Sequence, residues 1–466
     1  MRSAELAKRL GPLRDRLGDF AGDVRVVGGA VRDALLGLPF RGDVDLATHS
    51  DAPVLVEGWY VAGCVDEPPV VFARFGTAKT RIGGLRVEVA QTRTESYAED
   101  SRKPEVMAAD WPDDAARRDF TVNALAATLD GVVIDELGRG ITDLEQQVLD
   151  TPTDPTVTFS DDPLRILRAI RFRHRLGFRY ADRVWEAMQS NASRAAILSA
   201  ERIRDELQGI ISHESAASAM QDVVDCGLAA WILPELPAMR GVTQGSMHHL
   251  DVWDHSRLVL DHTISADPGA SVALRWAALL HDAAKPATRS IDEAGRIRFF
   301  DHEVLGAEMA AKILRRLRFS DRDVDSVYQL VRHHMRIGST TRWSDAALRR
   351  LIRDLGDQLP ELIALTAADS SALAPGVKRL DLDAFRTRLH DLQTRESVAK
   401  YESPLSGEAI MAIVGIPAGP EVGRWKQRLL TAVLDGALAP DDTVGAEAFL
   451  RKKMRVAKPP VVPGGD

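Results

Sequence analysis

Two carboxylates and a double glycine are the first residues whose types and spacing suit chemistry. Asp43 and Asp45 flank one apolar residue in a short segment with the pattern of a β-strand. Residues two apart on a strand point to the same face, so the two carboxylates should project together. Gly28 and Gly29 follow an apolar run and predict a turn with exposed backbone N–H groups. This combination can hold a divalent cation and a triphosphate together.

Neither half of this pattern is specific alone, because Gly-Gly occurs in many turns and Asp-x-Asp on many solvated strand edges. Together, GGAVRD and the following DVDLA resemble the signature of the nucleotidyltransferase superfamily. Their form is similar to the class II branch, which contains tRNA CCA-adding enzymes and bacterial poly(A) polymerases. The resemblance implies that Asp43 and Asp45 are catalytic and bind Mg²⁺, while Gly28, Gly29 and Arg32 position the nucleotide triphosphate.

The segment RRDFTVNALA, residues 117–126, contains a second group of polar residues. We expect it to begin a helix with Asp119 and Asn123 on one side, since residues four apart are neighbours on a helix surface. Asp119 would otherwise simply cap that helix. The segment resembles the second motif of the family, which implies that Arg118 contacts phosphate and that Asp119 and Asn123 contact the sugar.

A basic helix is predicted after Pro163, where Arg165, Arg168 and Arg171 recur between apolar residues. One face should pack and the other should present guanidiniums, although a merely solvated basic face remains the alternative. Asp162 and Arg165 offer acceptors and planar donors that can match the edge of a base. DDPLR resembles the class II motif in which protein side chains select the incoming C or A. Arg168 and Arg171 would then support the nucleotide or the RNA backbone.

Two shorter features bear on specificity. Residues 91–116 are polar and contain prolines, which predicts a mobile loop. Within it, Asp100-Ser101-Arg102 matches an acid–x–Arg element of the resembled family that is associated with the switch from adding C to adding A. This match favours complete CCA addition. Asp161 stands where the family usually has Glu, which is a change in a supporting residue.

Histidines cluster in the second half of the chain, where eight of the twelve lie between positions 248 and 334. An apolar helix ending in His-Asp, with further His and Asp from other helices, suits a divalent-metal site. The arrangement resembles the HD phosphohydrolase superfamily. It implies a second divalent metal, of unknown identity, held by His255, His281, Asp282 and Asp369. His302 and one of His333 or His334 are candidates for further ligands.

The order of strand and helix patterns predicts an α+β fold. A small mixed-sheet nucleotidyltransferase head should precede a mostly α-helical neck, HD domain and tail. We expect the head at residues 1–150 and a base-selecting, RNA-binding helical neck at 151–245. The HD metal-binding domain should occupy 246–375 and a helical tail 376–466.

Composition excludes several classes of protein. The chain has 466 residues, 45% of them hydrophobic, and a net charge of −8, which argues against indiscriminate nucleic-acid binding. Its sequence contains no apolar run of the roughly 18 residues that span a bilayer. The two cysteines, Cys64 and Cys226, form no metal motif, and a cytoplasmic location is the expectation.

The hypothesis that unites these observations is template-independent addition of CCA to the 3′ end of tRNA from CTP and ATP, with an additional HD phosphohydrolase activity. A bacterial poly(A) polymerase is the nearest alternative. A uridylyltransferase that modifies a regulatory protein is another, although it would not need a base-selecting arginine helix. The third alternative is an HD phosphohydrolase with an RNA-binding front half, which the presence of both Asp43 and Asp45 disfavours.

Overall fold

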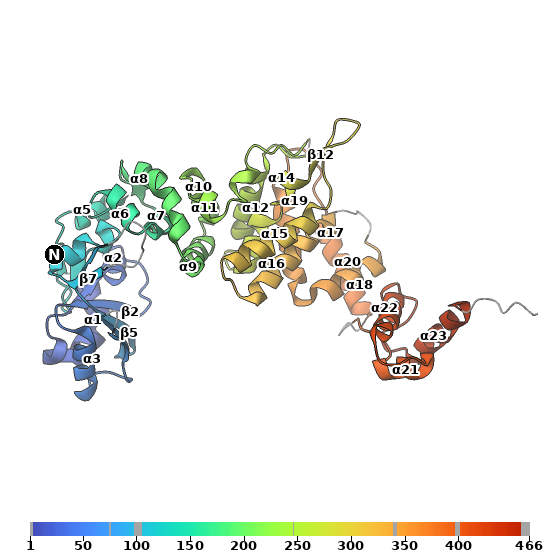
Figure 1. The fold of residues 1–466 in the computed structure, drawn as a ribbon, viewed down its shortest axis with the longest axis horizontal. Coiled ribbons are helices and arrows are strands. Elements are labelled where there is room, and N and C mark those ends of the chain that lie inside the picture. Colours follow the sequence, from blue (N-terminus) through green and yellow to red (C-terminus); the bar gives the residue numbers. More distant parts are fainter. Residues whose placement is uncertain are drawn as a thin grey trace, which may run out of the picture. The chain divides into compact units, whose positions relative to one another are not determined.

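The computed structural model describes residues 3–73, 76–96, 105–245, 247–338, 343–396 and 401–457. They form two compact units (Figure 1). The first comprises Met1–Arg240 with Ile313–Phe319, and the second comprises Gly241–Lys312 with Ser320–Asp466. The predicted fold class is confirmed, since a small mixed sheet lies in the head and helices dominate the rest. The finer division into four segments stays a prediction.

The head is built on a mixed sheet in which β2 and β5 pair in parallel and the other neighbours are antiparallel. A tight turn at Gly83 and Gly84 joins β4 to β5. In spatial order the seven described strands are β3 (Val70–Phe72), β4 (Thr77–Ile82), β5 (Leu85–Gln91), β2 (Asp43–Thr48), β1 (Arg25–Val27), β8 (Ala126–Ala127) and β9 (Val133–Ile134).

Alternation along β2 orients the two acids. Val44 and Leu46 are buried in the core, whereas Asp43 and Asp45 lie on the exposed face. The first helix, α1 (Ala4–Leu17), buries a stripe of leucines at helical spacing: Leu6, Leu10, Leu13 and Leu17. Two further helices, α2 (Gly29–Leu35) and α3 (Ala52–Val61), contact the strands that adjoin the acids.

Two local predictions are wrong. Residues 117–126 do not start a helix, because α4 (Trp111–Ala116) ends there and a 3₁₀ turn, η3 (Thr121–Asn123), leads into β8. Pairing of β8 with β1 overrides the local pattern. Residues 91–116 are not simply a loop, since β6 (Arg93–Ser96) pairs with β7 (Glu105–Ala108). Asp100-Ser101-Arg102 lies outside the described residues.

The neck consists of packed helices that follow the head within the first unit. Helix α7 (Leu164–Leu176) carries the arginines and buries Ile166, Leu167 and Ile170 on its other side. It packs against α9 (Ala200–Ile211) and α10 (Ala216–Asp225), while α6 (Pro155–Asp161) packs against α8 (Val184–Asn191). The prediction of one packed face is therefore confirmed.

The second unit surrounds a buried helix, α13 (Val272–Leu280), which contacts three others. These are α12 (Val252–Ala266), α16 (Asp321–His333) and α19 (Leu359–Ser371), and α15 (His302–Arg316) begins nearby (Figure 1). The final helices, α21 (Gly407–Val414), α22 (Pro420–Leu434) and α23 (Thr443–Ala457), share a separate apolar cluster around Ile410, Trp425 and Leu450. Among the described residues, no helix is long and apolar enough to cross a membrane.

Candidate active site and metal centre

The two predicted catalytic acids lie on one face of the central strands, and a third acid lies beside them. Asp45 is paired in register with Glu88 of the parallel neighbour β5, and Asp43 with Arg86. Directly paired residues share a face, so Glu88 adds a third carboxylate to this face. Arg86 donates to Asp43 Oδ2 at 2.8 Å. Both side chains of this ion pair are exposed, so the pair contributes little and is easily replaced.

The two acids have opposite pKa shifts. Hydrogen bonding from Arg86 lowers the pKa of Asp43. Desolvation by the surrounding protein raises the pKa of Asp45, and the negative charge of Glu88 raises it further. A bound cation would relieve this crowding of negative charge. Carboxylate oxygens are the ligands that Mg²⁺ prefers, so the residues on this face fit that ion.

Gly28 lies between Asp45 and the guanidinium of Arg118. It precedes α2 with φ 72° and ψ −132°, a conformation that only glycine adopts readily. A Cβ at this position would lie 3.7 Å from Arg118 Nη1 and 4.0 Å from Asp45 Oδ2. Because Gly28 has no side chain, the space between Arg118, which is predicted to bind phosphate, and Asp45, which is predicted to bind metal, stays open.

Asp114 holds Arg118 in place, a role that sequence reasoning missed. It is 3% exposed. Arg118 Nη2 donates to its Oδ2 at 2.9 Å, and Arg117 Nη2 donates to its Oδ1 at 2.5 Å. Burial would raise the pKa of Asp114, but the charges of the two arginines outweigh it and lower the pKa. The signal was available, because residues three and four apart on a helix are neighbours.

Asp119 and Asn123 are buried beneath the site. The Asn123 side chain donates to Asp119 Oδ1 at 3.0 Å, and Arg32 donates to Asn123 Oδ1. Arg32 is itself 2% exposed and stacks on Phe172 at 4.9 Å. These three predicted nucleotide-binding residues therefore contact one another, and their direct contact with sugar or phosphate stays a prediction.

Asp162 precedes the arginine helix and does not lie on its side. Its Oδ1 accepts from the backbone N–H of Leu164, and its Oδ2 accepts from Arg202 Nη2 at 2.6 Å. Arg165 Nη2 donates to the carbonyl oxygen of Arg117 at 2.6 Å. Pro163 between Asp162 and the helix explains this position, since α6 ends before it and α7 begins after it.

Arg168 and Arg171 do not project into solvent as a basic face would. Arg168 donates to Asp119 Oδ2 at 2.6 and 2.8 Å, and Arg171 Nε donates to Glu206 Oε2 at 2.6 Å. Glu206 also lies 3.4 Å from Arg168. The arginine helix is thereby tied to the head through Asp119 and to α9 through Glu206. A direct contact of these arginines with nucleotide or RNA stays a prediction.

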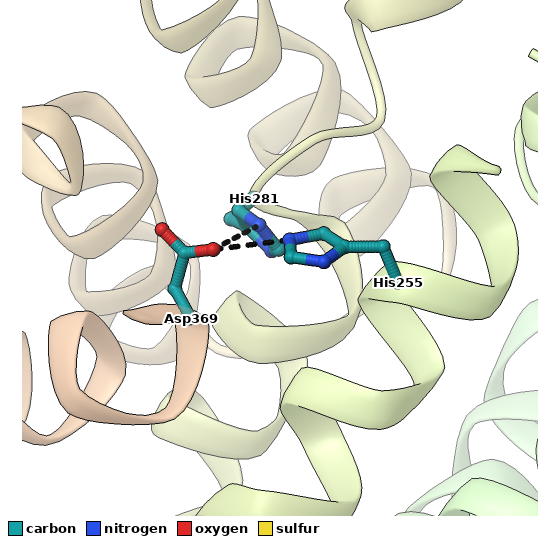
Figure 2. A group of neighbouring side chains, drawn as sticks. All are labelled: His255, His281 and Asp369. Carbon is teal, nitrogen blue, oxygen red and sulfur yellow. Dashed lines mark hydrogen bonds and ion pairs between the residues drawn. The ribbon is translucent and has the colours of Figure 1, made fainter. Parts of the chain in front are cut away.

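The second unit brings the predicted HD residues together from separate helices. Figure 2 shows His255, His281 and Asp369 pointing toward one another. His255 Nε2 lies 3.0 Å from Asp369 Oδ1, and His281 Nε2 lies 4.0 Å from the same oxygen. These three residues offer ligand atoms within 4.8 Å of one another. They fit a divalent cation that accepts nitrogen and oxygen ligands.

Asp282 completes this group and is 1% exposed. Its Oδ2 lies 3.2 Å from His281 Nε2 and 2.6 Å from the ammonium of Lys285. Burial would lower the pKa of His281, but the charges of Asp282 and Asp369 outweigh it and raise the pKa. Sequence reasoning named His281, Asp282, His255 and Asp369, and the structure brings all four together.

His302 and His334 lie on the other side of Asp282, where the three residues form a second potential metal-binding group. Of the two adjacent histidines, His334 is the one that lies in this group. His333 lies beside Arg336 instead, with 3.4 Å between Nδ1 and the guanidinium.

Three family models match the chain. A model described as "Poly A polymerase head domain" matches residues 24–150. A model described as "Probable RNA and SrmB- binding site of polymerase A" matches 177–239, and one described as "HD domain" matches 252–374.

Named relatives agree with these models. The chain is 34% identical over 450 residues to the CC-adding tRNA nucleotidyltransferase of Thermus thermophilus, covering 92% of this chain and 93% of that one. It is 36% identical over 332 residues to the A-adding tRNA nucleotidyltransferase of Deinococcus radiodurans, covering 69% and 74%. Its fold is similar to that of the Bacillus stearothermophilus CCA-adding enzyme solved with CTP, with TM-score 0.67, 24% identity and coverage of 97% and 98%. On this similarity, extending over nearly its whole length, the chain belongs to the tRNA nucleotidyltransferase family.

Proposed function

We propose that this protein adds nucleotides to the 3′ end of tRNA without a nucleic-acid template, and that it completes the CCA sequence from CTP and ATP. One observation supports this function above the others. Asp43, Asp45 and Glu88 share a face next to Gly28, whose missing side chain leaves room between Asp45 and Arg118. Acids on one side and a cation on the other suit a metal-bound triphosphate.

In this mechanism Asp43 and Asp45 hold Mg²⁺, which when bound stabilises charge on the triphosphate and favours ionisation of the attacking tRNA hydroxyl. Arg118, oriented by Asp114, orients the triphosphate so that pyrophosphate can leave. Asp43 must release Arg86 to take this role. Breaking that ion pair costs little free energy, because both side chains are exposed. The oxygen of the tRNA 3′ hydroxyl bonds to the α-phosphorus as the bond to pyrophosphate breaks.

Base selection is assigned to Asp162 and Arg165. Arg165 has further N–H groups beyond the one that it gives to the Arg117 carbonyl. Asp162 keeps a second lone pair on each oxygen, although both oxygens already accept a hydrogen bond. Arg202 therefore has the role of orienting the Asp162 carboxylate toward the base.

The test is incubation of the protein with a tRNA that lacks its 3′ CCA, followed by sequencing of the products. We expect C, C and A in that order with both nucleotides present. The Asp43→Ala variant should incorporate neither CTP nor ATP while it retains the wild-type circular dichroism spectrum. Incorporation by that variant would refute the active-site assignment, and long A-tails without CTP would favour a poly(A) polymerase.

Addition of C alone is the second candidate, because the relative that matches over 92% of this chain is named CC-adding. The match of Asp100-Ser101-Arg102 to the loop element associated with adding A favours the complete reaction. The same sequencing distinguishes the two functions, since products that end in CC despite excess ATP would replace the first proposal with the second.

We further propose that the HD site is a metal-dependent phosphohydrolase. A water oxygen would bond to phosphorus, and the bond to the ester oxygen would break, with the water proton passing to that oxygen. A 2′,3′-cyclic phosphate or a phosphate monoester is the expected class of substrate. His281→Ala should abolish phosphate release and leave nucleotide addition unchanged, and retained phosphate release would refute this role.

We also propose a cytoplasmic location. Cys64 and Cys226 are buried and form no disulfide, which fits a reducing compartment.

A further inference from the structure

The exposed face of the head sheet continues beyond the catalytic acids to the edge strand β3. Pairing in register forms one row of side chains across β2, β5, β4 and β3: Asp45, Glu88, Lys79 and Val70. Neighbouring strands lie about 4.8 Å apart, so this row extends about 14 Å from Asp45. Gly28 follows β1, which is the other neighbour of β2. The acids therefore divide this face into a β1 side and a β5 side.

Nucleotidyl transfer needs these two sides for different groups. The attacking and leaving oxygens lie roughly in line at the transferred phosphorus. The site proposed above for the triphosphate and its departing pyrophosphate is at Gly28 and Arg118, on the β1 side of Asp45. The attacking 3′ hydroxyl should therefore approach from the β5 side, over Glu88. The RNA end that carries this hydroxyl would then lie across β4 and β3.

Side chains on the β5 side combine cations with apolar groups. Arg86 pairs in register with Arg81, and both are exposed, as is Lys79 in the next row. At the sheet edge Val70 and Phe72 are 57% and 40% exposed. The Lys79 ammonium lies 6.0 Å from the centroid of the Phe72 ring. Cations that contact phosphates, together with an aromatic ring on which a base can stack, are typical of sites for single-stranded RNA.

Two of these cations are paired with the acids that would bind Mg²⁺. Arg86 donates to Asp43 Oδ2 at 2.8 Å, and Lys79 Nζ lies 2.9 Å from Glu88 Oε2. Both ion pairs are exposed, so breaking them costs little free energy. A divalent cation attracts the same carboxylates and repels both side chains, so metal binding releases them. The released Arg86 and Lys79 are then available for the phosphates of an RNA strand.

We propose that the 3′-terminal nucleotides of the tRNA bind to this surface, here called the primer face: Arg86, Arg81, Lys79, Val70 and Phe72. Lys79 and Arg86 contact backbone phosphates, and a base stacks on Phe72. Stacked nucleotides are about 3.4 Å apart, so a surface about 14 Å long holds the last few of them. This inference rests on the nucleotide addition proposed above and names the place of its RNA substrate. A protein strand added to the open edge of β3 is the alternative occupant, but it would leave the cations unused.

Kinetics with a tRNA that lacks its CCA test the primer face, because KM for tRNA and KM for CTP are measured separately. Phe72→Ala should raise KM for tRNA at least about fivefold, which corresponds to ~1 kcal/mol for one stacked base, and leave KM for CTP unchanged. Val71→Ala is the matched control. Val71 adjoins Phe72 and is 42% exposed, but it lies on the opposite face of β3, so neither KM should change.

Binding of the same tRNA, measured by fluorescence anisotropy without CTP, tests the cations independently of turnover. Lys79→Gln should weaken binding and lower the slope of log affinity against log salt concentration by about one. Arg81→Gln should have the same effect on the slope. If Phe72→Ala does not fold, these two variants decide the question.

Each other outcome contradicts a stated step. Unchanged KM for tRNA in Phe72→Ala and an unchanged salt slope in Lys79→Gln would overturn the primer face and leave nucleotide addition intact. Equal rises in KM for Phe72→Ala and Val71→Ala would also overturn it, because only one of these side chains lies on that face. A dimer in sedimentation that Phe72→Ala dissociates, with KM for tRNA unchanged, would assign the edge to a second copy of the chain. A wild-type protein that incorporates no nucleotide would refute the proposed function and the primer face with it.

Discussion

Replacing Gly28 with alanine tests whether the turn before α2 positions the active site. The backbone there has φ 72° and ψ −132°. An L-residue in such a conformation costs about 1–3 kcal/mol. Gly29 provides a matched control, because it lies in α2 and its added Cβ would meet only the Arg32 guanidinium at 3.6 Å. Gly29→Ala should be neutral or stabilise the protein by about 0.4–1 kcal/mol.

The two variants should therefore differ by roughly 1–4 kcal/mol in the free energy of unfolding. For a unit of this size each kcal/mol moves the melting temperature by about 2–4 °C. Calorimetry of the full chain should thus show a lower melting temperature for the unit that contains the head in Gly28→Ala, and an unchanged or higher one in Gly29→Ala. In Gly28→Ala the new Cβ also lies 3.7 Å from Arg118 Nη1.

Activity should separate the variants further. The added methyl group in Gly28→Ala occupies the space between Arg118 and Asp45, so we expect kcat/KM for CTP to fall at least about tenfold, equivalent to 1.4 kcal/mol. Gly29→Ala should lose less activity than Gly28→Ala, because its added methyl group lies against Arg32 and not between Arg118 and Asp45. Equal losses in the two variants, or a neutral Gly28→Ala, would refute the argument from backbone conformation.

Three further substitutions test the contacts around the site. Asp114→Asn should destabilise the protein by about 1–3 kcal/mol and raise KM for CTP, because Arg118 loses its charged partner. The pKa of Asp114 is lowered in the folded protein, so this contribution is present above the unfolded value of about 3.9 and is lost as pH falls below it. The difference in melting temperature from wild type should thus be full at pH 7 and narrow below about pH 4, whereas a constant difference would contradict the charge argument. Arg202→Met should increase misincorporation in sequenced products, since Asp162 loses the donor that orients it, and unchanged fidelity would count against that role. Glu206→Gln should lower stability by about 1–3 kcal/mol in calorimetry, and an unaltered transition would show that the arginine helix does not depend on it.

The sequence alone predicted the features that depend only on residues close together in the chain. The alternation of Asp43 and Asp45 with apolar residues places both acids on one face of β2, and β2 forms as predicted. Likewise, the spacing of Arg165 and Arg168 among apolar residues predicts the packed helix α7. These properties follow from the two-residue period of strands and the 3.6-residue period of helices, and both periods are visible in the sequence.

The contacts between residues distant in the chain were determined only by the tertiary structure. Arg168 is 49 positions from Asp119, so nothing local indicates that the predicted basic face is engaged by buried acids. Helix prediction also failed at residues 117–126, because pairing with β1 overrides the local preference. His333 and His334 are indistinguishable in the sequence, yet adjacent helical positions point about 100° apart. Only the packed helices of the second unit show that His334 faces Asp282.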